Sequence, residues 1–500
     1  MKKTFLLSYI AFIFSAFLVS SCIQTFDEVF TETEYPEEEE EESPQGPTDL
    51  DNISDTYADI AAYENSHLWG PYNLHDPSVI DTGDGWYYCY STDVAYGQTL
   101  RAGIMVRRSR DLVDWEYVGW ALDGLPAEAV SYIEGQGANP NDGIWAPYIM
   151  KVGSQYRLYY SLASDGFRIS TIGLLTSNSP EGPWTEAGLA VSSVENGPGT
   201  NAIDPTVVVT PSGEHYMYYG SAWDGLFIVQ LDPATGLAMS PGDRGTLIVK
   251  RGMTNGIYNG NLEGPEIIYN EEEQKYYLFV AWDWIDTKYN VRVYRSDAPT
   301  GPFLDWNGVD AANPNDDYPP MLMGPYAFGD HYGYQGVSHP SVFKATDGHY
   351  YIMTQARPAI DRFFMNMHLR RLFWSENGWP MISPERYANV EQTPITADEL
   401  IGTYDQVLHV YETVPGYADE QANPNIYYSF ETVLHADGTI NGDPNNTWTY
   451  DAPNLELVWG GEFVDSFIVS RERDWENKVA STIVMTGFNG GGLAIWLKKK

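Results

Sequence analysis

The chain is poor in cysteine: its 500 residues include only two, Cys22 and Cys89. Small secreted domains that cannot bury enough apolar surface depend on several disulfides, and this composition excludes such a framework. Stability must therefore come from a large apolar core, for which 500 residues give ample chain. The length fits two or three domains, or one large all-β domain followed by a smaller one.

Positive charge is also scarce, with 28 Lys and Arg against 69 Asp and Glu, and the formal net charge is −41. So acidic a chain offers no basic face to phosphate groups, which makes nucleic acid a poor partner. Residues 23–55 hold thirteen of the acidic residues and no Lys or Arg. Such a segment cannot collapse. We therefore predict that residues 22–58 form a solvated tether.

The N-terminus has the features of an export signal. Met1-Lys2-Lys3 precedes an apolar run that is too short for a comfortable membrane span, and Ser20-Ser21-Cys22 follows it. This ending resembles a bacterial lipobox, where the signal is removed before the cysteine and the thiol carries lipid. We predict a signal peptide at residues 1–21 and an outer membrane lipoprotein of a Gram-negative bacterium, at the cell surface or in the periplasm, anchored through Cys22. The alternative is an ordinary secretory signal with an incidental cysteine.

Long amphipathic helices are not evident after residue 70, where short aromatic and β-branched runs alternate with Gly, Pro, Asn and Asp. This texture favours strands and turns. Tyrosine pairs recur, each some ten to fifteen residues after a short motif centred on proline, which is an internal repeat. The five motifs are Asp76-Pro77-Ser78-Val79, Ala146-Pro147-Tyr148-Ile149, Asp204-Pro205-Thr206-Val207, Gly264-Pro265-Glu266-Ile267 and His339-Pro340-Ser341-Val342.

The motifs are 58 to 76 residues apart, which suits one four-stranded blade each. We predict an all-β fold, with a five-bladed β-propeller at residues 59–390 and a small C-terminal β-barrel domain at residues 391–500. The innermost strand of every propeller blade starts near the central axis, so side chains at that repeat position converge on one pocket. The sequence therefore predicts that three carboxyl groups and one imidazole lie together, and these belong to Asp76, Asp204, Glu263 and His339.

Three carboxyl groups and a histidine in one cleft suit metal-assisted hydrolysis or glycoside hydrolysis. The second fits better, because a glycosidase needs one protonated carboxyl group as acid and one ionised carboxylate, and packing like charges together separates their pKa values. A third carboxylate is useful in that setting, since it can raise the pKa of the acid and orient it.

Several segments resemble glycoside hydrolase family 43, and its arabinanases in particular, from about residue 70 to the C-terminus. The matching segments are His75-Asp76-Pro77-Ser78, Asn201-Ala202-Ile203-Asp204-Pro205, Tyr219-Gly220-Ser221-Ala222-Trp223, Gln230-Leu231-Asp232-Pro233, Glu263-Gly264-Pro265, Ser338-His339-Pro340, Gly378-Trp379-Pro380 and Ser383-Pro384-Glu385-Arg386-Tyr387. The last domain resembles the β-barrel appended to longer arabinanases.

The resemblance implies an inverting hydrolase of α-1,5-L-arabinan in which Asp76 is the general base, Glu263 the general acid and Asp204 the group that tunes and orients the acid. It also implies that His339 helps to hold one central calcium ion, largely through water. Within the repeat, Glu266 is a rival for the acid, but it lies three residues further along the strand and points away from the axis if Glu263 points towards it.

Three further residues are candidate substrate contacts: Trp145, Trp223 and Asn201. An indole face can cover the apolar side of a pentose ring, although either tryptophan could instead belong to the propeller core. The chain departs from the family at Tyr148, where arabinanases often carry an acidic residue. This departure affects the contribution of the second blade to substrate contacts and leaves the three carboxyl residues in place.

Two other functions remain open. An exo-acting arabinofuranosidase or β-xylosidase would share the propeller and the acidic trio, and the shape of the cleft decides, since an open groove admits a polymer and a closed pocket admits chain ends. The inserts at residues 134–141 and 313–336 could form its walls. A non-catalytic glycan-binding lipoprotein is the second alternative, although binding alone needs no such trio. We expect a monomer whose C-terminal domain packs against the propeller and supports it, or else binds glycan.

Overall fold

The computed structural model describes residues 48–500 apart from Phe167, Asn196, Pro198, Trp223, Asn255, residues 315–319, residues 412–414 and residue 417. The predicted signal peptide, the lipidation site at Cys22 and most of the acidic tether lie outside the described residues. Within the described part, no helix is both long enough and apolar enough to cross a membrane.

The first described residues are packed against the rest of the chain. They form three short 3-10 helices, η1 (Leu50–Asn52), η2 (Ala58–Ile60) and η3 (Tyr63–Leu68). Asp51 pairs with Arg473. Asp55 accepts hydrogen bonds from the hydroxyl groups of Tyr332 and Tyr334. The chain is therefore anchored before residue 58, which was the predicted end of the solvated tether.

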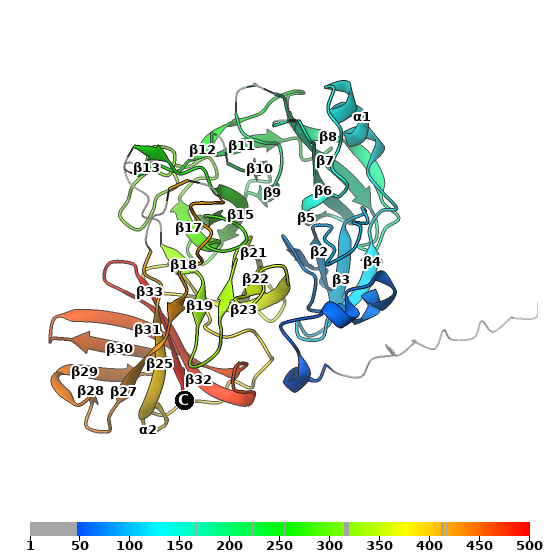
Figure 1. The fold of residues 1–500 in the computed structure, drawn as a ribbon. Coiled ribbons are helices and arrows are strands. Elements are labelled where there is room, and N and C mark those ends of the chain that lie inside the picture. The colour runs from blue at the N-terminus through cyan, green and yellow to red at the C-terminus, as the bar shows by residue number, and fades with distance from the viewer. Residues whose placement is uncertain are drawn as a thin grey trace, which may run out of the picture. The chain divides into compact units, whose positions relative to one another are not determined.

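Antiparallel sheets arranged in a ring make up most of the described part (Figure 1). Four of them have four strands each, hydrogen-bonded in chain order. They are β1 (Ser78–Asp81), β2 (Tyr87–Ser91), β3 (Met105–Ser109) and β4 (Glu116–Trp120); β5 (Trp145–Val152), β6 (Gln155–Ala163), β7 (Ser170–Ser177) and β8 (Thr185–Ser193); β9 (Thr206–Val209), β10 (His215–Tyr219), β11 (Leu226–Leu231) and β12 (Thr246–Val249); and β15 (Leu262–Asn270), β16 (Lys275–Trp282), β17 (Asn290–Ser296) and β18 (Met321–Met323).

The fifth sheet differs from the predicted four-stranded unit because it has seven strands. Its strands β21, β22, β23 and β24 pair in chain order like those of the other sheets, while β20, β19 and β26 extend it beside the far end of β22. The strands are β19 (Tyr326–Ala327), β20 (Tyr334–Gln335), β21 (Ser341–Lys344), β22 (Tyr350–Pro358), β23 (Asn366–Trp374), β24 (Pro380–Ile382) and β26 (Tyr427–Tyr428).

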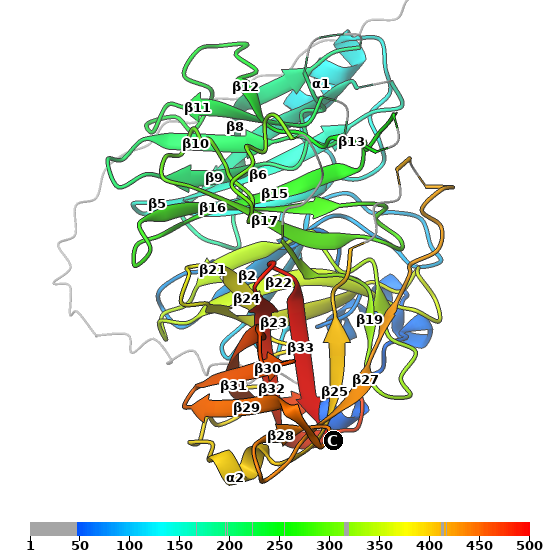
Figure 2. The same ribbon diagram turned by 90° about the vertical axis from the view of Figure 1, so that its left-hand side faces the viewer.

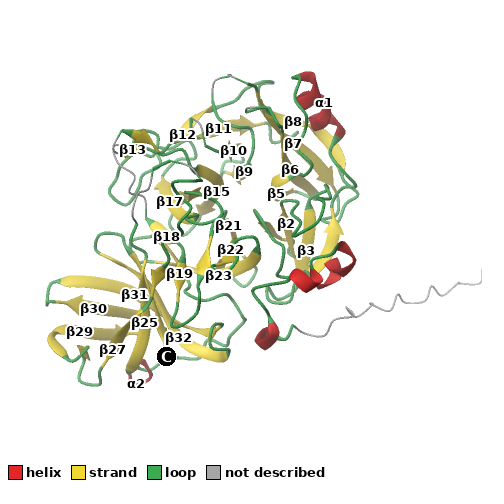
Figure 3. Ribbon diagram, viewed as in Figure 1, coloured by secondary structure: helices red, strands yellow, loops and turns green. Residues whose placement is uncertain are grey.

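The inner strands close the ring: β1 contacts β5, β5 contacts β9, β9 contacts β15, β15 contacts β21, and β21 contacts β1. The prediction of an all-β propeller is thus confirmed. Helices are few in the described part, as Figure 3 shows, and the α-helices are α1 (Ala127–Gly135) and α2 (Ala397–Leu400). A short hairpin of β13 (Met253–Thr254) and β14 (Ile257–Tyr258) lies between the third and fourth sheets in sequence.

The tyrosine pairs join one sheet to the next. Each pair lies on the second strand of its sheet, and side chains on both faces of this strand are buried. The aromatic rings are therefore packed on all sides, and their hydroxyl groups still need a hydrogen-bond partner. Three of their hydroxyl groups, and that of Tyr90 just after the first pair, find it at a backbone carbonyl of the following sheet or its turns. These bonds run from Tyr90 to Pro180, from Tyr159 to Gly236, from Tyr218 to Pro299 and from Tyr277 to Gly378.

A second set of bonds joins neighbouring inner strands, at the residue that follows each motif proline. The side chain of this residue forms a hydrogen bond with the backbone of the next inner strand, at the second residue after that strand's motif proline. The Ile149 amide donates to Ser78 Oγ (3.1 Å), the Ile267 amide to Thr206 Oγ1 (3.3 Å), the Val342 amide to Glu266 Oε1 (3.0 Å) and the Val79 amide to Ser341 Oγ (3.0 Å), while the Tyr148 hydroxyl donates to the Val207 carbonyl (2.7 Å). These five bonds run once round the ring.

The remaining strands form a closed eight-stranded barrel, as predicted for the C-terminal domain. They are β25 (Gly402–Leu408), β27 (Phe430–Leu434), β28 (Thr439–Ile440), β29 (Asp443–Asp451), β30 (Asn454–Trp459), β31 (Phe463–Asp474), β32 (Val479–Asn489) and β33 (Ala494–Lys499). Its interior is filled by buried aliphatic and aromatic side chains, among them Tyr404, Leu455 and Leu497.

The barrel packs against the fourth and fifth sheets (Figure 2): β33 contacts β18, and β32 contacts β24. One apolar cluster spans the contact, with Trp496 and Phe488 from the barrel and Tyr326, Phe328 and Trp379 from the propeller. Because core side chains are shared across it, the interface resembles the interior of one domain.

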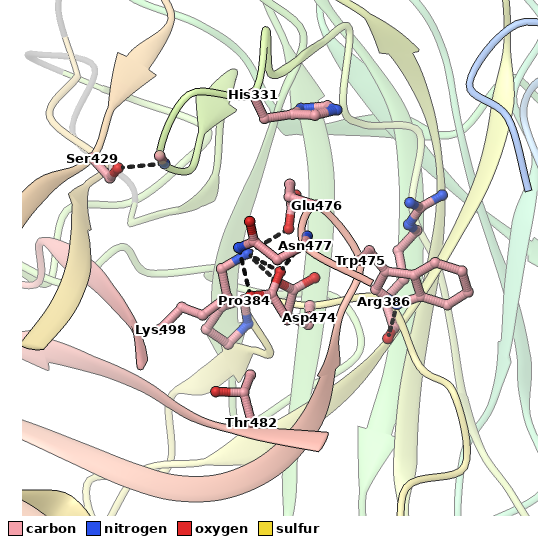
Figure 4. A network of polar contacts seen from close by, with 12 residues as sticks. His331, Pro384, Arg386, Ser429, Asp474, Trp475, Glu476, Asn477, Thr482 and Lys498 are labelled. Atoms are coloured by element: carbon pink, nitrogen blue, oxygen red, sulfur yellow. Dashed lines mark hydrogen bonds and ion pairs between the residues drawn. The ribbon is translucent and has the colours of Figure 1, made fainter. Parts of the chain in front are cut away.

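A buried ammonium group lies beside this cluster (Figure 4). Lys498 Nζ lies 2.7 Å from Glu385, which follows β24, and 2.9 Å and 2.5 Å from Asp474 and Glu476 of the barrel. The Lys498 side chain is 2% exposed. Glu385, Asp474 and Glu476 also form the one group of three metal-ligating side chains found among the described residues, and Lys498 supplies its positive charge.

We predict that Lys498→Met destabilises the protein by about 3–5 kcal/mol, because removing one partner leaves the opposing buried charges uncompensated. Urea denaturation followed by tryptophan fluorescence measures this. Lys500→Met is the matched control, since Lys500 pairs with Glu431 at the surface and such a pair contributes about 0–1 kcal/mol. Equal midpoints for the two variants would contradict a stabilising role of the buried cluster.

Candidate active site

The residue before each motif proline begins an inner strand in a left-handed backbone conformation. The φ angles are 47° at Asp76, 33° at Ala146, 57° at Asp204, 55° at Gly264 and 55° at His339. For a residue other than glycine this conformation costs about 1–3 kcal/mol and persists only where the surroundings impose it. The shared geometry makes Gly264 the fourth member of the repeat, with Glu263 one residue earlier.

Polar side chains hold the backbone of four of these positions, and each comes from the preceding sheet of the ring. The Asp76 amide donates to Gln355 Oε1 (2.8 Å), the Ala146 amide to Thr92 Oγ1 (2.7 Å), the Asp204 amide to Ser161 Oγ (3.1 Å) and the Gly264 amide to Asp204 Oδ2 (3.1 Å). Asp204 therefore fixes the backbone next to Glu263.

Asp76 lies between two imidazole rings. Its Oδ2 is 2.7 Å from His75 Nδ1 and accepts a hydrogen bond from Thr92 Oγ1 (2.7 Å), while its Oδ1 is 3.0 Å from His339 Nδ1. Burial by itself would raise the pKa of Asp76, but His339 and His75 together hold that pKa well below its usual value. Asp76 is thus a buried, ionised carboxylate.

His339 responds in the opposite sense. Burial lowers the pKa of this imidazole, but the neighbouring carboxylates, Asp76 first, raise it to about 9. The Tyr289 hydroxyl lies 3.5 Å from His339 Nδ1. Burial, followed by the charges of Glu263, Asp76 and Asp204, raises the pKa of Tyr289 well above its usual value, so the hydroxyl keeps its proton.

Asp204 and Glu263 differ in exposure. Asp204 is buried, whereas Glu263 is partly exposed at the start of β15 and accepts a hydrogen bond from Ser221 Oγ (2.8 Å). Burial, with the charges of Glu263 and Asp76, raises the pKa of Asp204 to about 8, although His339 and the Gly264 amide oppose the rise. Asp204 therefore keeps its proton at neutral pH.

Glu266 has a different environment from Glu263. Both of its carboxyl oxygens accept hydrogen bonds, one from Thr206 Oγ1 (2.9 Å) and the other from the Val342 amide. It is buried, and burial raises its pKa to about 7. Glu266 therefore joins three neighbouring inner strands and has no oxygen left for a substrate.

The predicted substrate contacts lie as follows. Trp145 is partly buried at the first position of β5, opposite Ser161, and Asn201 is partly buried before the inner strand β9. Trp223 lies outside the described residues. Tyr148 points between two sheets, where its hydroxyl bonds the Val207 carbonyl. The departure from the family pattern at Tyr148 thus lies in the packing between sheets.

Sequence reasoning did not identify the residues that hold the carboxyl groups in place. Thr92, Ser161, Ser221 and Gln355 each lie within three residues of the end of a second strand, the strand that follows a motif strand in chain order. Aligning the ends of the second strands across the repeats could have drawn attention to these positions. Tyr289 has no counterpart in the repeat and carried no such signal.

A ring of sheets whose centre holds an ionised carboxylate, a partly exposed carboxyl group and a buried third one with a raised pKa has the groups that glycoside hydrolysis needs. The sequence comparison agrees with this class. Residues 70–380 match glycosyl hydrolases family 43, and residues 384–497 match the C-terminal lipocalin-like domain found with that family. The chain belongs to glycosyl hydrolases family 43 and is a glycoside hydrolase.

Similar proteins are known by sequence and by structure. An extracellular endo-α-(1→5)-L-arabinanase of Thermotoga petrophila is 26% identical over 85% of this chain and 93% of its own length. An extracellular exo-α-(1→5)-L-arabinofuranosidase of Cellvibrio japonicus is 28% identical over 62% of this chain and 86% of its own. The crystal structure of endo-1,5-α-L-arabinanase from Thermotoga petrophila has a TM-score of 0.72 and 25% identity, covering 86% of this chain and 99% of that one.

We predict that Glu266→Gln keeps most of the hydrolytic activity, because an amide oxygen can still accept from Val342. Its effect should fall on stability. The folded-state pKa of about 7 exceeds the unfolded value of about 4.3, so wild-type stability falls as pH rises between these values and is constant above them. Melting temperatures from pH 4 to 8 should therefore drop for the wild type relative to Glu266→Gln. A large loss of activity in this variant would again make Glu266 a candidate for the general acid.

Proposed function

We propose that this protein cleaves α-1,5-L-arabinan internally, with inversion at the anomeric carbon. The observation that carries the proposal is the contrast between two carboxyl groups at the ring centre: Asp76 is buried and ionised, whereas Glu263 is partly exposed and lies next to Asp204, a buried carboxyl group whose pKa is raised to about 8. An inverting glycosidase needs a base and an acid in such different states. In this proposal β21–β24 are the fifth blade of a five-bladed propeller.

Each carboxyl group has its own role. Asp76 takes a proton from a water molecule as that water's oxygen attacks the anomeric carbon. Glu263 gives its proton to the glycosidic oxygen while the bond from that oxygen to the anomeric carbon breaks. Asp204 orients Glu263 through the Gly264 amide and is proposed to be the group that tunes the acid. Trp145, Asn201 and Trp223 are proposed to contact the sugar.

The similar proteins support arabinan as the substrate. The relative from Thermotoga petrophila is described as endo-acting, and its similarity covers 85% of the chain, more than the propeller alone contains. The relative from Cellvibrio japonicus is described as exo-acting, and its similarity covers 62%. The endo-acting relative thus shares the larger part of this chain, which favours internal cleavage, and exo-action is the second candidate.

We predict that linear α-1,5-arabinan gives a ladder of oligosaccharides early in the reaction, because a groove that holds a polymer allows cleavage at many bonds. Sizing the products by anion-exchange chromatography measures this. Arabinose alone from the first minutes would favour the exo-acting alternative. No product at all, together with measurable binding, would favour a non-catalytic glycan-binding lipoprotein.

We predict that the acid and the base respond differently to substitution. Asp76→Ala should lower turnover by about 10²–10⁴-fold on every substrate, because water is no longer deprotonated. Glu263→Ala should cause a similar loss on arabinan and a smaller one on a nitrophenyl arabinotrioside, whose leaving group departs without a proton. Turnover numbers on the two substrates test this. Equal losses in the Glu263 variant would remove its assignment as the acid.

We also propose that His339 contributes to binding one calcium ion. His339 Nδ1 faces Asp76, so an ion would bind at Nε2 in place of the proton there, and no cage of three ligating side chains surrounds His339 among the described residues. These residues fit an ion held mainly by water. A bound cation would add positive charge next to the carboxyl groups. We predict that exhaustive chelation lowers the melting temperature and the activity, and that calcium restores both. The calcium site is excluded if elemental analysis finds no calcium and chelation changes neither the melting temperature nor the activity.

The location of the protein is a further part of the proposal. Cys22 is proposed to carry a lipid that anchors a monomer to the outer membrane of a Gram-negative bacterium, at the surface or in the periplasm. The basis is the pattern of residues 19–22, together with the description of the relatives as extracellular. Labelling of the wild type, but not of Cys22→Ala, with a radioactive fatty acid in cells is the expected result.

A further inference from the structure

One segment of the barrel domain reaches the fourth sheet of the propeller, close to where Glu263 lies. This segment consists of the described residues 409–411, 415–416 and 418–426, between the barrel strands β25 and β27. The Tyr411 ring packs against Trp282, and the Arg292 guanidinium group lies over it at 3.8 Å from the ring centre. The Tyr411 hydroxyl accepts a hydrogen bond from Arg251 Nη2. The segment thus rests on the fourth sheet, which carries Glu263.

We propose that Gln421 in this segment is a positioning residue for Glu263, an inference that rests on the proposed role of Glu263 as the acid. Gln421 is 1% exposed, although it belongs to a connection between strands. Its Oε1 accepts a hydrogen bond from Asn261 Nδ2 (2.9 Å). Asn261 directly precedes β15 and is two residues before Glu263, so this bond holds the chain where it enters that strand.

The other end of the Gln421 amide holds the neighbouring strand. Its Nε2 donates to Asp283 Oδ1 (3.1 Å), and Asp283 directly follows β16. The Asp283 amide in turn donates to the Asn261 carbonyl (3.1 Å), which continues the ladder between β15 and β16 beyond its last regular pair. One side chain from the barrel thus bridges both strands at the point where Glu263 emerges.

The backbone of Gln421 contacts the connection between β16 and β17, which leads to Tyr289. Its carbonyl accepts a hydrogen bond from Thr287 Oγ1 (2.6 Å), in the connection between β16 and β17. Two residues later in that connection lies Tyr289, whose hydroxyl is 3.5 Å from His339 Nδ1. The barrel segment therefore holds the chain both at the start of β15 and in the connection between β16 and β17.

The bridge is anchored by a buried ion pair within the propeller. Arg251 Nη1 lies 2.8 Å from Asp283 Oδ1 and donates to the Asn261 carbonyl (2.9 Å). Asp283 Oδ2 accepts from Asn290 Nδ2 (2.9 Å). Because Arg251 and Asn290 come from the propeller itself, the strands should remain folded without Gln421. What the barrel adds is the alignment of their ends, and the acid needs that alignment to meet the glycosidic oxygen.

The test uses the full-length Gln421→Met variant, which keeps the length of the side chain and removes its donor and acceptor. On linear arabinan, kcat should fall by about 10- to 100-fold, the range that small misplacements of a reacting group produce. On a nitrophenyl arabinotrioside, which needs no proton from Glu263, kcat should change by less than about threefold. KM should change little on either substrate, since the sugar contacts are untouched.

Gln406→Met is the matched control, because Gln406 is a buried glutamine of the same barrel that accepts from Thr432 within it. It should lower the melting temperature and change kcat by the same factor on both substrates. A variant separates the substrates when its kcat falls more on arabinan than on the nitrophenyl arabinotrioside. Glu263→Ala is measured alongside. If Glu263→Ala separates the substrates and Gln421→Met does not, or if Gln406→Met separates them equally, the positioning role is wrong and the acid stands. If Glu263→Ala does not separate them, the proposed acid is wrong and the inference fails with it.

Discussion

The innermost strands are tied to one another by one side-chain bond each, at the residue after the motif proline. Ser78, Thr206, Glu266 and Ser341 accept from the next strand, and Tyr148 donates to it. A closed ring of strands has no free edge at its centre, so every inner strand must meet both neighbours in register. The carboxyl groups lie two or three residues before these bonds. Their convergence is therefore a consequence of ring closure.

The same constraint explains the backbone geometry at the centre. Asp76, Asp204 and His339 adopt left-handed conformations that are unfavourable for their residue type, and bonds from the preceding sheet hold the amides of Asp76 and Asp204. Gln355 and Ser161, which accept those bonds, touch the backbone of the site and not its carboxyl oxygens. The cost in local strain is met by the packing of the whole ring, which is how such geometry persists at functional sites.

Electrostatic differences then separate carboxyl groups that the repeat makes equivalent. Asp76 lies against His75 and His339, which stabilise its charge, whereas Asp204 is buried close to other carboxyl groups and holds a proton more readily. Burial acts on both, and the neighbours decide the net direction. The barrel domain belongs to this arrangement, because it shares core side chains with the fifth sheet and hydrogen bonds with the fourth.

Much of this could be predicted from the sequence, because periodic features survive in a linear chain. The spacing of the motifs predicted a propeller and brought Asp76, Asp204, Glu263 and His339 to one centre, and the strand pattern after residue 390 predicted the barrel. The number of strands in the fifth sheet could not be predicted, since β26 comes from between two barrel strands.

Contacts outside the repeat were decided by the tertiary structure alone. Gln421 lies 160 residues from Asn261, whose side chain it holds. Lys498 gathers Glu385, Asp474 and Glu476 from two domains. Neither Gln421 nor Lys498 recurs with the repeat, and each is a single polar side chain that is indistinguishable in sequence from an exposed one. Its partner is chosen only when packing buries both, because an unpaired polar group in the interior is then too costly.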